Sequence, residues 1–198
     1  KFPAAVLAEF RGALPHASQR LSEQDLLTWA QEGITLAHAS IRSWEAALEY
    51  FKATPRVLEH LDMSHVLNWA SWGQRLSEHS PAISCAYFQA SPEAVTLLPS
   101  HRIGDWAELG RSLYKGSWKS GAMACQFFQT SPRFLRYLSL REARQFVLLV
   151  DSLSERSYEL ASECLALGET VFAGIEKEDR GLFLDFASVL AQNNHMDI

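Results

Sequence analysis

Large aromatic side chains recur along the chain at spacings of 37 or 40 residues, and other residues follow each of them at fixed offsets. Four residues after the aromatic comes a small residue in four of the five copies, and seven residues after it comes a leucine in every copy. Offsets of four and seven lie on one face of an α-helix, so the pattern predicts a buried helical stripe. The five aromatics are Trp29, Trp69, Trp106, Phe146 and Phe183.

A second motif recurs in register with the first: an aromatic pair, then a serine or threonine followed by proline. Each proline stands 14 residues before the next large aromatic. A hydroxyl residue before proline is a common helix start, and the residue before proline avoids helical angles. We therefore expect one helix to end at the aromatic pair and a short third helix to begin at the proline. The three copies occupy 50–55, 87–92 and 127–132.

Serines mark the expected helix starts. One serine stands seven residues before each aromatic-pair position, where its hydroxyl would cap the helix that carries the pair. Ser22 and Ser139 are expected to cap helices that carry the large aromatic. Glycine recurs in the buried stripe despite its cost in a helix, which predicts close approach by a neighbouring helix. The capping serines are Ser43, Ser80, Ser120 and Ser157, and the glycines are Gly33, Gly73 and Gly110.

These motifs together predict an all-α fold, a right-handed α-solenoid of the armadillo/HEAT-like class. About four three-helix repeats of 37–40 residues are expected, with a partial unit at each end of a single helical-repeat domain. Because the chain begins at Lys1 rather than at a methionine, we expect it to be a piece of a longer protein. The expected units are 1–21 (partial), 22–61, 62–98, 99–138, 139–175 and 176–198 (partial).

The composition narrows the class of protein. Hydrophobic residues make up 47% of the 198 residues, too many for a disordered chain, yet no run approaches the roughly 18 apolar residues of a membrane span. Three cysteines without a CxxC motif argue against a disulfide framework or a zinc site and favour a cytoplasmic setting. Cys85, Cys125 and Cys164 fall in slots that elsewhere hold leucine or an aromatic, so we expect them to be buried and inert.

The net charge of −5 is unevenly distributed. Residues 102–149 carry 8 basic and 3 acidic side chains, whereas the segments on both sides are acidic. This basic band, residues 102–144, could bind an acidic partner or an anionic ligand, or it could be a solvated face that balances its neighbours. The acidic total and the lack of a recognised motif make nucleic-acid binding unlikely.

Several aromatics lie outside the repeat slots and beside basic residues. Exposed aromatics in such a setting are typical of binding surfaces. The alternative is that they fill gaps between the repeat units, as could Trp44 and Trp72. The candidate partner-binding residues are Tyr114, Lys115, Trp118, Lys119, Arg133, Arg136, Arg141 and Arg144.

Two stretches carry a family resemblance, Trp-Ala-Ser-Trp-Gly-Gln-Arg-Leu at 69–76 and Ala-Tyr-Phe-Gln-Ala-Ser-Pro at 86–92. They resemble the helical repeats found ahead of the von Willebrand A domain in bacterial proteins of the nitric oxide reductase activation type. The resemblance implies an accessory module that works with a MoxR-type ATPase in maturation of a metalloenzyme. The Asp-x-Ser-x-Ser adhesion motif is absent from the sequence, so any A domain would lie outside this chain.

The function predicted from these features is a non-catalytic scaffold that binds a protein or peptide partner along an extended surface. No catalytic residue, metal ligand or cofactor is predicted. The alternative is a helical ligand-binding or metal-binding domain, or an enzyme, with a cleft lined by histidines such as His38 and His79.

Overall fold

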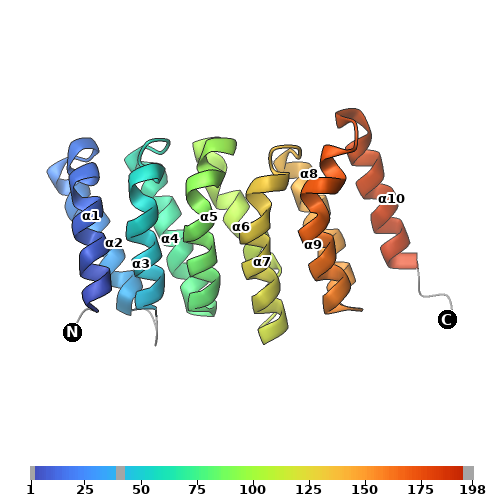
Figure 1. Cartoon of the computed structure of the whole chain (residues 1–198), viewed down its shortest axis with the longest axis horizontal. Helices are drawn as coiled ribbons and strands as arrows, with labels where there is room; N and C mark the ends of the chain where they lie inside the picture. Colours follow the sequence, from blue (N-terminus) through green and yellow to red (C-terminus); the bar gives the residue numbers. More distant parts are fainter. Residues whose placement is uncertain (1–2, 39–42, 194–198) are drawn as a thin grey trace. The chain divides into compact units, whose positions relative to one another are not determined.

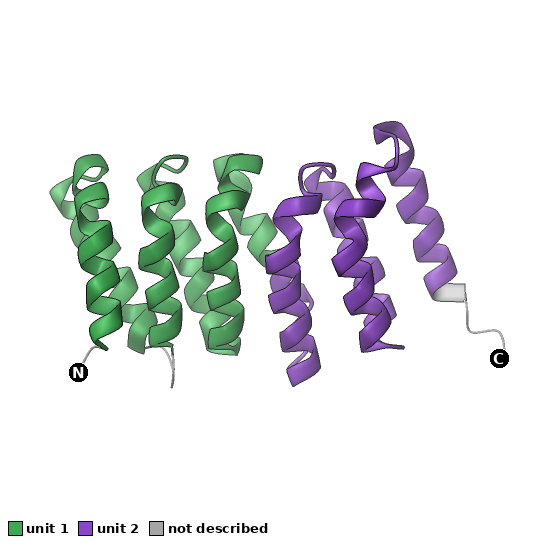
Figure 2. Cartoon of the chain, viewed as in Figure 1, with its two compact units in different colours: residues 1–108 green, residues 109–198 purple. Residues whose placement is uncertain are grey.

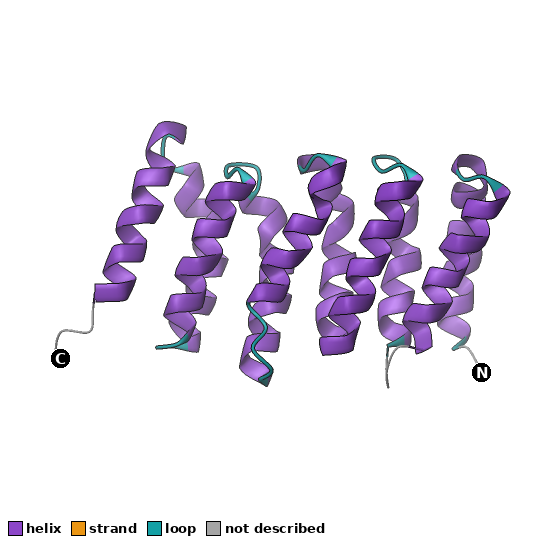
Figure 3. Cartoon of the chain, turned by 180° about the vertical axis from the view of Figure 1, so that it is seen from behind, coloured by secondary structure: helices purple, strands orange, loops and turns teal. Residues whose placement is uncertain are grey.

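The computed structural model describes residues 3–38 and 43–193, and this part of the chain is helical throughout, without a strand (Figures 1 and 3). The all-α prediction is therefore confirmed. Ten α-helices alternate with short turns, and two of these turns contain a 3-10 helix. The helices are α1 (Ala4–Arg20), α2 (Glu23–His38), α3 (Trp44–Val57), α4 (Met63–His79), α5 (Pro81–Leu97), α6 (Ile103–Ser112), α7 (Trp118–Phe134), α8 (Leu140–Ser154), α9 (Tyr158–Ala173) and α10 (Arg180–Asn193).

The helices gather into two compact units, residues 1–108 and residues 109–198, with the boundary inside α6 (Figure 2). Each unit has two layers of helices (Figure 1). In unit 1, α1, α3 and α5 pack side by side in one layer, and α2 and α4 pack behind them. In unit 2, α7 and α9 form one layer, and α8 and α10 form the other.

The prediction of three helices per repeat is wrong, because each repeat consists of two. The second helix continues through the proline that was expected to end it, so Pro55, Pro92 and Pro132 lie inside α3, α5 and α7. Proline in a helix interior costs about 3 kcal/mol and bends the helix. The apolar side chains that follow it, such as Val57 and Leu58 after Pro55, are buried. This packing outweighs the cost of the proline, so the helix continues past it.

Thr54 and Ser91, which precede Pro55 and Pro92, do not cap a helix. Each is buried and relays a hydrogen bond between two helices. Thr54 Oγ1 accepts a bond from the indole of Trp29 at 3.2 Å and donates to the carbonyl of Tyr50 at 2.8 Å. The Tyr50 hydroxyl donates back to the carbonyl of Trp29 at 3.2 Å, which closes a circuit between α2 and α3. Such back-bonding to the preceding turn accompanies helix bending, which fits the neighbouring proline.

The same circuit recurs between α4 and α5. Trp69 Nε1 donates to Ser91 Oγ at 2.8 Å, and Ser91 Oγ donates to the carbonyl of Tyr87 at 2.7 Å. The Tyr87 hydroxyl donates to the carbonyl of Trp69 at 3.3 Å. Burial raises the pKa of both Tyr50 and Tyr87 well above its ordinary value, so each phenol remains a neutral donor.

The recurrent glycines have the role that their position in the stripe predicts. At Gly33, Gly73 and Gly110, an added methyl group would overlap a phenylalanine ring of the second helix of the same repeat. These rings belong to Phe51, Phe88 and Phe128 and are buried. The prediction of close helix approach is therefore confirmed.

The fourth repeat uses different residues in these two slots. It has Val150 in the glycine slot and Leu165 in the phenylalanine slot, and both side chains are fully buried. A larger residue on one helix thus accompanies a smaller one on the other, an exchange that keeps the total volume similar.

The serine caps are confirmed only in part. Ser22, Ser139 and Ser157 accept bonds from backbone amides at their helix starts, as expected. Ser43 and Ser80 occupy cap positions without a side-chain cap bond. In α7 the cap is Ser117 rather than Ser120, since the two serines form a reciprocal capping box in which Ser120 is the third helical residue.

Gly73→Ala tests the contact between glycine and phenylalanine. The added methyl overlaps the buried Phe88 ring, so we expect the free energy of unfolding to fall by about 1–3 kcal/mol in urea denaturation. The control is Gly12→Ala in α1, where the methyl meets no atom within 4 Å. That substitution should be neutral or stabilising by up to about 1 kcal/mol. Equal effects of the two substitutions would contradict the packing described here.

Ser91→Ala tests the hydrogen-bond relay. It leaves the buried Trp69 indole without its acceptor, which should lower the free energy of unfolding by about 1–3 kcal/mol. Ser91→Thr is the matched control, since threonine fills the same slot at Thr54, and it should cost under about 1 kcal/mol. Urea denaturation of the two variants would contradict the relay if alanine were tolerated as well as threonine.

Candidate functional site

The eight candidate partner-binding residues form two groups, one at each end of α7. Tyr114, Lys115, Trp118 and Lys119 lie in the turn before α7 and in its first turn. The other four are Arg133, Arg136, Arg141 and Arg144, in the last turn of α7, the turn that follows and the start of α8. Because Lys119 and Arg133 are 14 residues apart on α7, about 21 Å of helix separates the groups. They therefore do not form a single site.

The turn before α7 is tightly built. Gly116 has a positive φ of 79°, a conformation that side chains disfavour and glycine adopts freely. The backbone amide of Lys115 donates to Ser120 Oγ at 3.0 Å, and Ser117 caps the helix through the reciprocal bonds with Ser120. These bonds fix the backbone immediately before Trp118, the first residue of α7.

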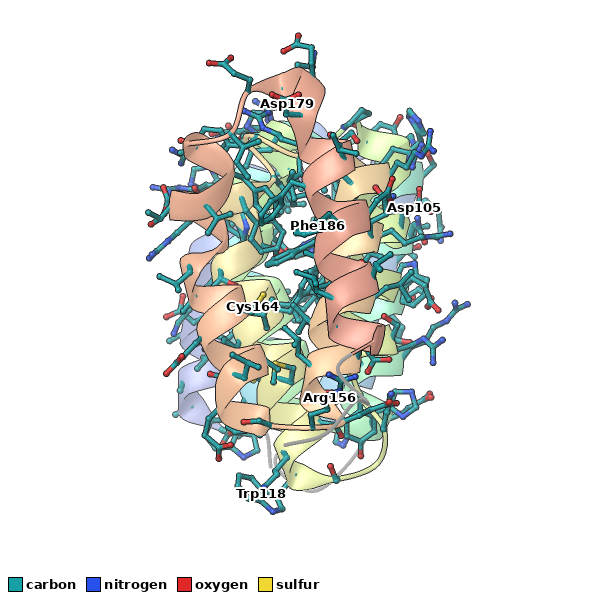
Figure 4. The ribbon with its side chains drawn as sticks, turned by 90° about the vertical axis from the view of Figure 1, so that its right-hand side faces the viewer. Asp105, Trp118, Arg156, Cys164, Asp179 and Phe186 are labelled. Carbon is teal, nitrogen blue, oxygen red and sulfur yellow. The ribbon has the colours of Figure 1, made fainter. Side chains whose placement is uncertain are left out.

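Trp118 projects from this end of α7 and is 75% exposed, the most exposed large apolar side chain among the described residues (Figure 4). Its ring lies 6.2 Å from that of Tyr158, the first residue of α9. The ammonium of Lys119 lies 5.8 Å from the centre of the indole, a cation–π arrangement. Two helix starts thus present an aromatic pair with a cation beside it.

A hollow of about 220 Å³ adjoins these aromatics. We call this hollow together with Trp118 the Trp118 surface. Its walls come from the turn before α7, the first residues of α7, the end of α8 and the start of α9. The lining residues are Lys115, Ser117, Lys119, Ser120, Met123, Ser154, Glu155 and Tyr158. Hydroxyls, charges and one apolar side chain therefore converge on a single concave surface.

Lys115 is held by acidic residues of α8 and the turn that follows it. Its ammonium lies 2.7 Å from Asp151 and 3.2 Å from Glu155. The hydrogen bond to Asp151 is the main cause that raises the pKa of Lys115, against a smaller opposing effect of burial. This lysine therefore joins the turn before α7 to the end of α8, and Lys119 is left as the cation at the aromatic rim.

The basic band is spread over the two units. Arg102 belongs to unit 1 and pairs with Asp105 at 2.5 Å, whereas Lys115 pairs within unit 2. Arg133, Arg141 and Arg144 are exposed. Binding of an anionic ligand at this band stays a prediction.

The other aromatics outside the repeat slots have different surroundings. Trp72 is half-buried between Gly104, whose added methyl would lie 2.8 Å from the indole nitrogen, and Arg75, which lies 5.0 Å from the ring. It fills a gap in unit 1, the second of the two interpretations above. Trp44 is also half-buried, and Trp118 alone of these three tryptophans is exposed.

Tyr158 is the residue of the Trp118 surface that sequence reasoning missed, although a signal was present. An aromatic follows the capping serine in three repeats, at Trp44, Trp118 and Tyr158. Residues that begin equivalent helices lie at the same end of their repeats, so this recurrence could have predicted that Trp118 and Tyr158 are neighbours.

The cysteines are half-buried rather than fully buried, which corrects the expectation in part. Burial raises the pKa of Cys164 to about 11 and raises that of Cys125, so both thiols favour their neutral, less nucleophilic form. His38 and His79 are the last residues of α2 and α4 and are exposed. In the part of the chain that the structure describes, no three His, Cys, Asp or Glu side chains are grouped so as to hold a metal ion.

None of the described helices combines the length and the apolar character needed to cross a membrane. No family model matches the chain, and no curated protein or solved structure is significantly similar to it.

Proposed function

We propose that this chain is a non-catalytic helical-repeat scaffold that binds a protein or peptide partner through the Trp118 surface. The observation that carries the proposal is the 75% exposure of Trp118 on a helix start whose backbone is fixed by a capping box. We further propose that the helix pairs stack as a right-handed α-solenoid of the armadillo/HEAT-like class, an arrangement that offers extended surfaces for recognition.

Tryptophan is the residue type most suited to anchor such an interface. Its large ring loses much water contact when covered, while only two side-chain angles become fixed. The neighbouring Tyr158 ring and the Lys119 ammonium already restrict the indole before a partner arrives. A preorganised anchor spends less conformational entropy on binding.

The hollow beside the indole indicates what the partner should carry. An aliphatic or aromatic side chain of the partner would contact the rings of Trp118 and Tyr158. A carbonyl or carboxylate oxygen near that side chain would accept a bond from the Lys119 ammonium. A short segment of mixed apolar and acidic character meets both requirements.

Charged groups of the hollow favour binding over catalysis, because Lys115 and Glu155 pair with one another. The ammonium of Lys115 is engaged by Asp151 and Glu155, so these groups stabilise the walls of the hollow. The sequence resemblance described above would make the partner a component of a MoxR-type ATPase system for metalloenzyme maturation. That assignment rests on the two motif stretches.

Trp118→Ala tests the proposal against peptides selected from a random library on the wild-type chain. Peptides that contact the indole should bind the variant at least tenfold more weakly, a loss of about 1.4 kcal/mol or more, by isothermal titration calorimetry. The free energy of unfolding should change by less than about 0.5 kcal/mol, because the side chain is exposed.

The matched control is Leu27→Ala, which removes an exposed apolar side chain of unit 1. It should leave the same affinities within about twofold. If selection yields no peptide that distinguishes Trp118→Ala from the control, the Trp118 surface is not the binding site.

A further inference from the structure

The last helix of the chain exposes an apolar face. Phe186 of α10 is 61% exposed, and other exposed apolar side chains accompany it on α10 and α9 (Figure 4). We call this set the C-terminal face. Its members are Leu160, Leu167, Leu182, Phe186, Val189 and Leu190.

The repeat frame explains why α10 is uncovered. Phe183, Ala187 and Leu190 occupy the aromatic, small and leucine slots, so α10 is the first helix of a repeat whose second helix is not among the described ones. The residues equivalent to Leu190 in the first two repeats, Leu36 and Leu76, are fully buried. Leu190 is therefore exposed because the second helix that would cover it is not among the described helices.

Helix α9 is uncovered for the same reason. Its counterpart α3 packs between α1 and α5, which fully bury Ala46 and almost fully bury Ala53. The equivalent residues of α9 are Leu160 and Leu167, and both are about half exposed. They mark the place where one more helix of the same layer would pack.

At the other end of the described chain, α1 lacks the first helix of its repeat, whereas α10 lacks the second. Pro15 of α1 matches the prolines inside α3 and α5, so α1 is the second helix of a repeat whose first helix is not among the described ones. Leu7 is 42% exposed, whereas its equivalent Ala47 is fully buried. An apolar hollow of about 190 Å³ opens here, lined by Val6, Leu7, Phe10, Ala30, Ile34 and Phe51.

The two ends are therefore the two halves of one helix pair. We propose that copies of this chain associate head to tail, with α10 of one copy and α1 of the next forming a complete repeat. A heterologous contact of this kind joins different surfaces of the two copies and can continue into longer assemblies.

The residues at the two ends match one another. Between neighbouring first helices of unit 1, Gln74 donates a hydrogen bond to Glu32. Counting along the frame, Phe186 stands in the slot of Glu32, and Ile34 stands in the slot of Gln74. The polar pair of the internal contact is thus replaced at the ends by two exposed apolar side chains, Phe186 and Ile34.

The two ends also carry compatible residues in the slots that hold glycine and phenylalanine in the internal repeats. The small-residue slot of α10 holds Ala187, and a methyl group at this slot leaves no room for a phenyl ring in the internal repeats. The corresponding residue of α1 is Arg11 instead of phenylalanine. Its aliphatic stem can cover the alanine while its guanidinium stays in water.

Sedimentation velocity of the purified 198-residue chain at increasing concentrations tests this proposal, because it measures the mass of the species present. We expect dimers and larger species, with at least tenfold weaker association for Phe186→Asp and for Leu7→Asp, because each places a charge in an apolar contact. An equimolar mixture of these two variants keeps one intact pair of ends and should form dimers but nothing larger. That rescue also demonstrates that both variants fold.

Leu148→Asp is the control, since Leu148 is 60% exposed on α8 but belongs to neither end, and it should assemble like the wild type. The proposal is overturned if the wild-type chain keeps the monomer mass at every concentration, as expected if another protein or a further segment of a longer chain covers these faces. It is also overturned if the mixture of Phe186→Asp and Leu7→Asp stays monomeric, or if only one of these variants weakens association.

Discussion

The fold depends on a phenylalanine ring that lies directly on a glycine of its partner helix. This contact occurs at Gly33, Gly73 and Gly110, where even a methyl group would overlap the ring. It lets the two helices of a repeat approach closely enough for the indole of Trp29 to donate to the Thr54 hydroxyl and for the Tyr50 hydroxyl to donate to the carbonyl of Trp29. Close packing and the buried hydrogen-bond circuit are thus two consequences of the same missing side chain.

The pairing of helices explains why some apolar side chains are exposed and others are buried. Among the described residues, the repeat-slot side chains Leu7 and Leu190 are exposed where a neighbouring helix is missing, and we propose that they are places of assembly. Trp118 lies outside those slots, so no absent helix of the frame accounts for its exposure. Two kinds of exposed apolar surface therefore exist, and each has its own proposed partner.

The sequence predicted the all-α class, the buried stripe and the close approach at glycine, because these follow from spacing along one helix. It misled at the prolines, since a local signal for a helix start was outweighed by burial of the residues beyond Pro55 and Pro92. It also treated Lys115 and Arg144 as one basic site, although α7 separates the groups to which they belong. Pairing of Lys115 with Asp151, 36 residues away, depends on tertiary packing that local patterns do not contain.

The most direct test of this account is a double-mutant cycle of Gly73→Ala and Phe88→Leu, measured by urea denaturation. The fourth repeat combines Val150 with Leu165 in these slots, so a smaller side chain at position 88 should relieve the overlap caused by the methyl group. We predict that the double variant is more stable than the sum of the single effects by at least about 1 kcal/mol. Strictly additive effects would contradict it.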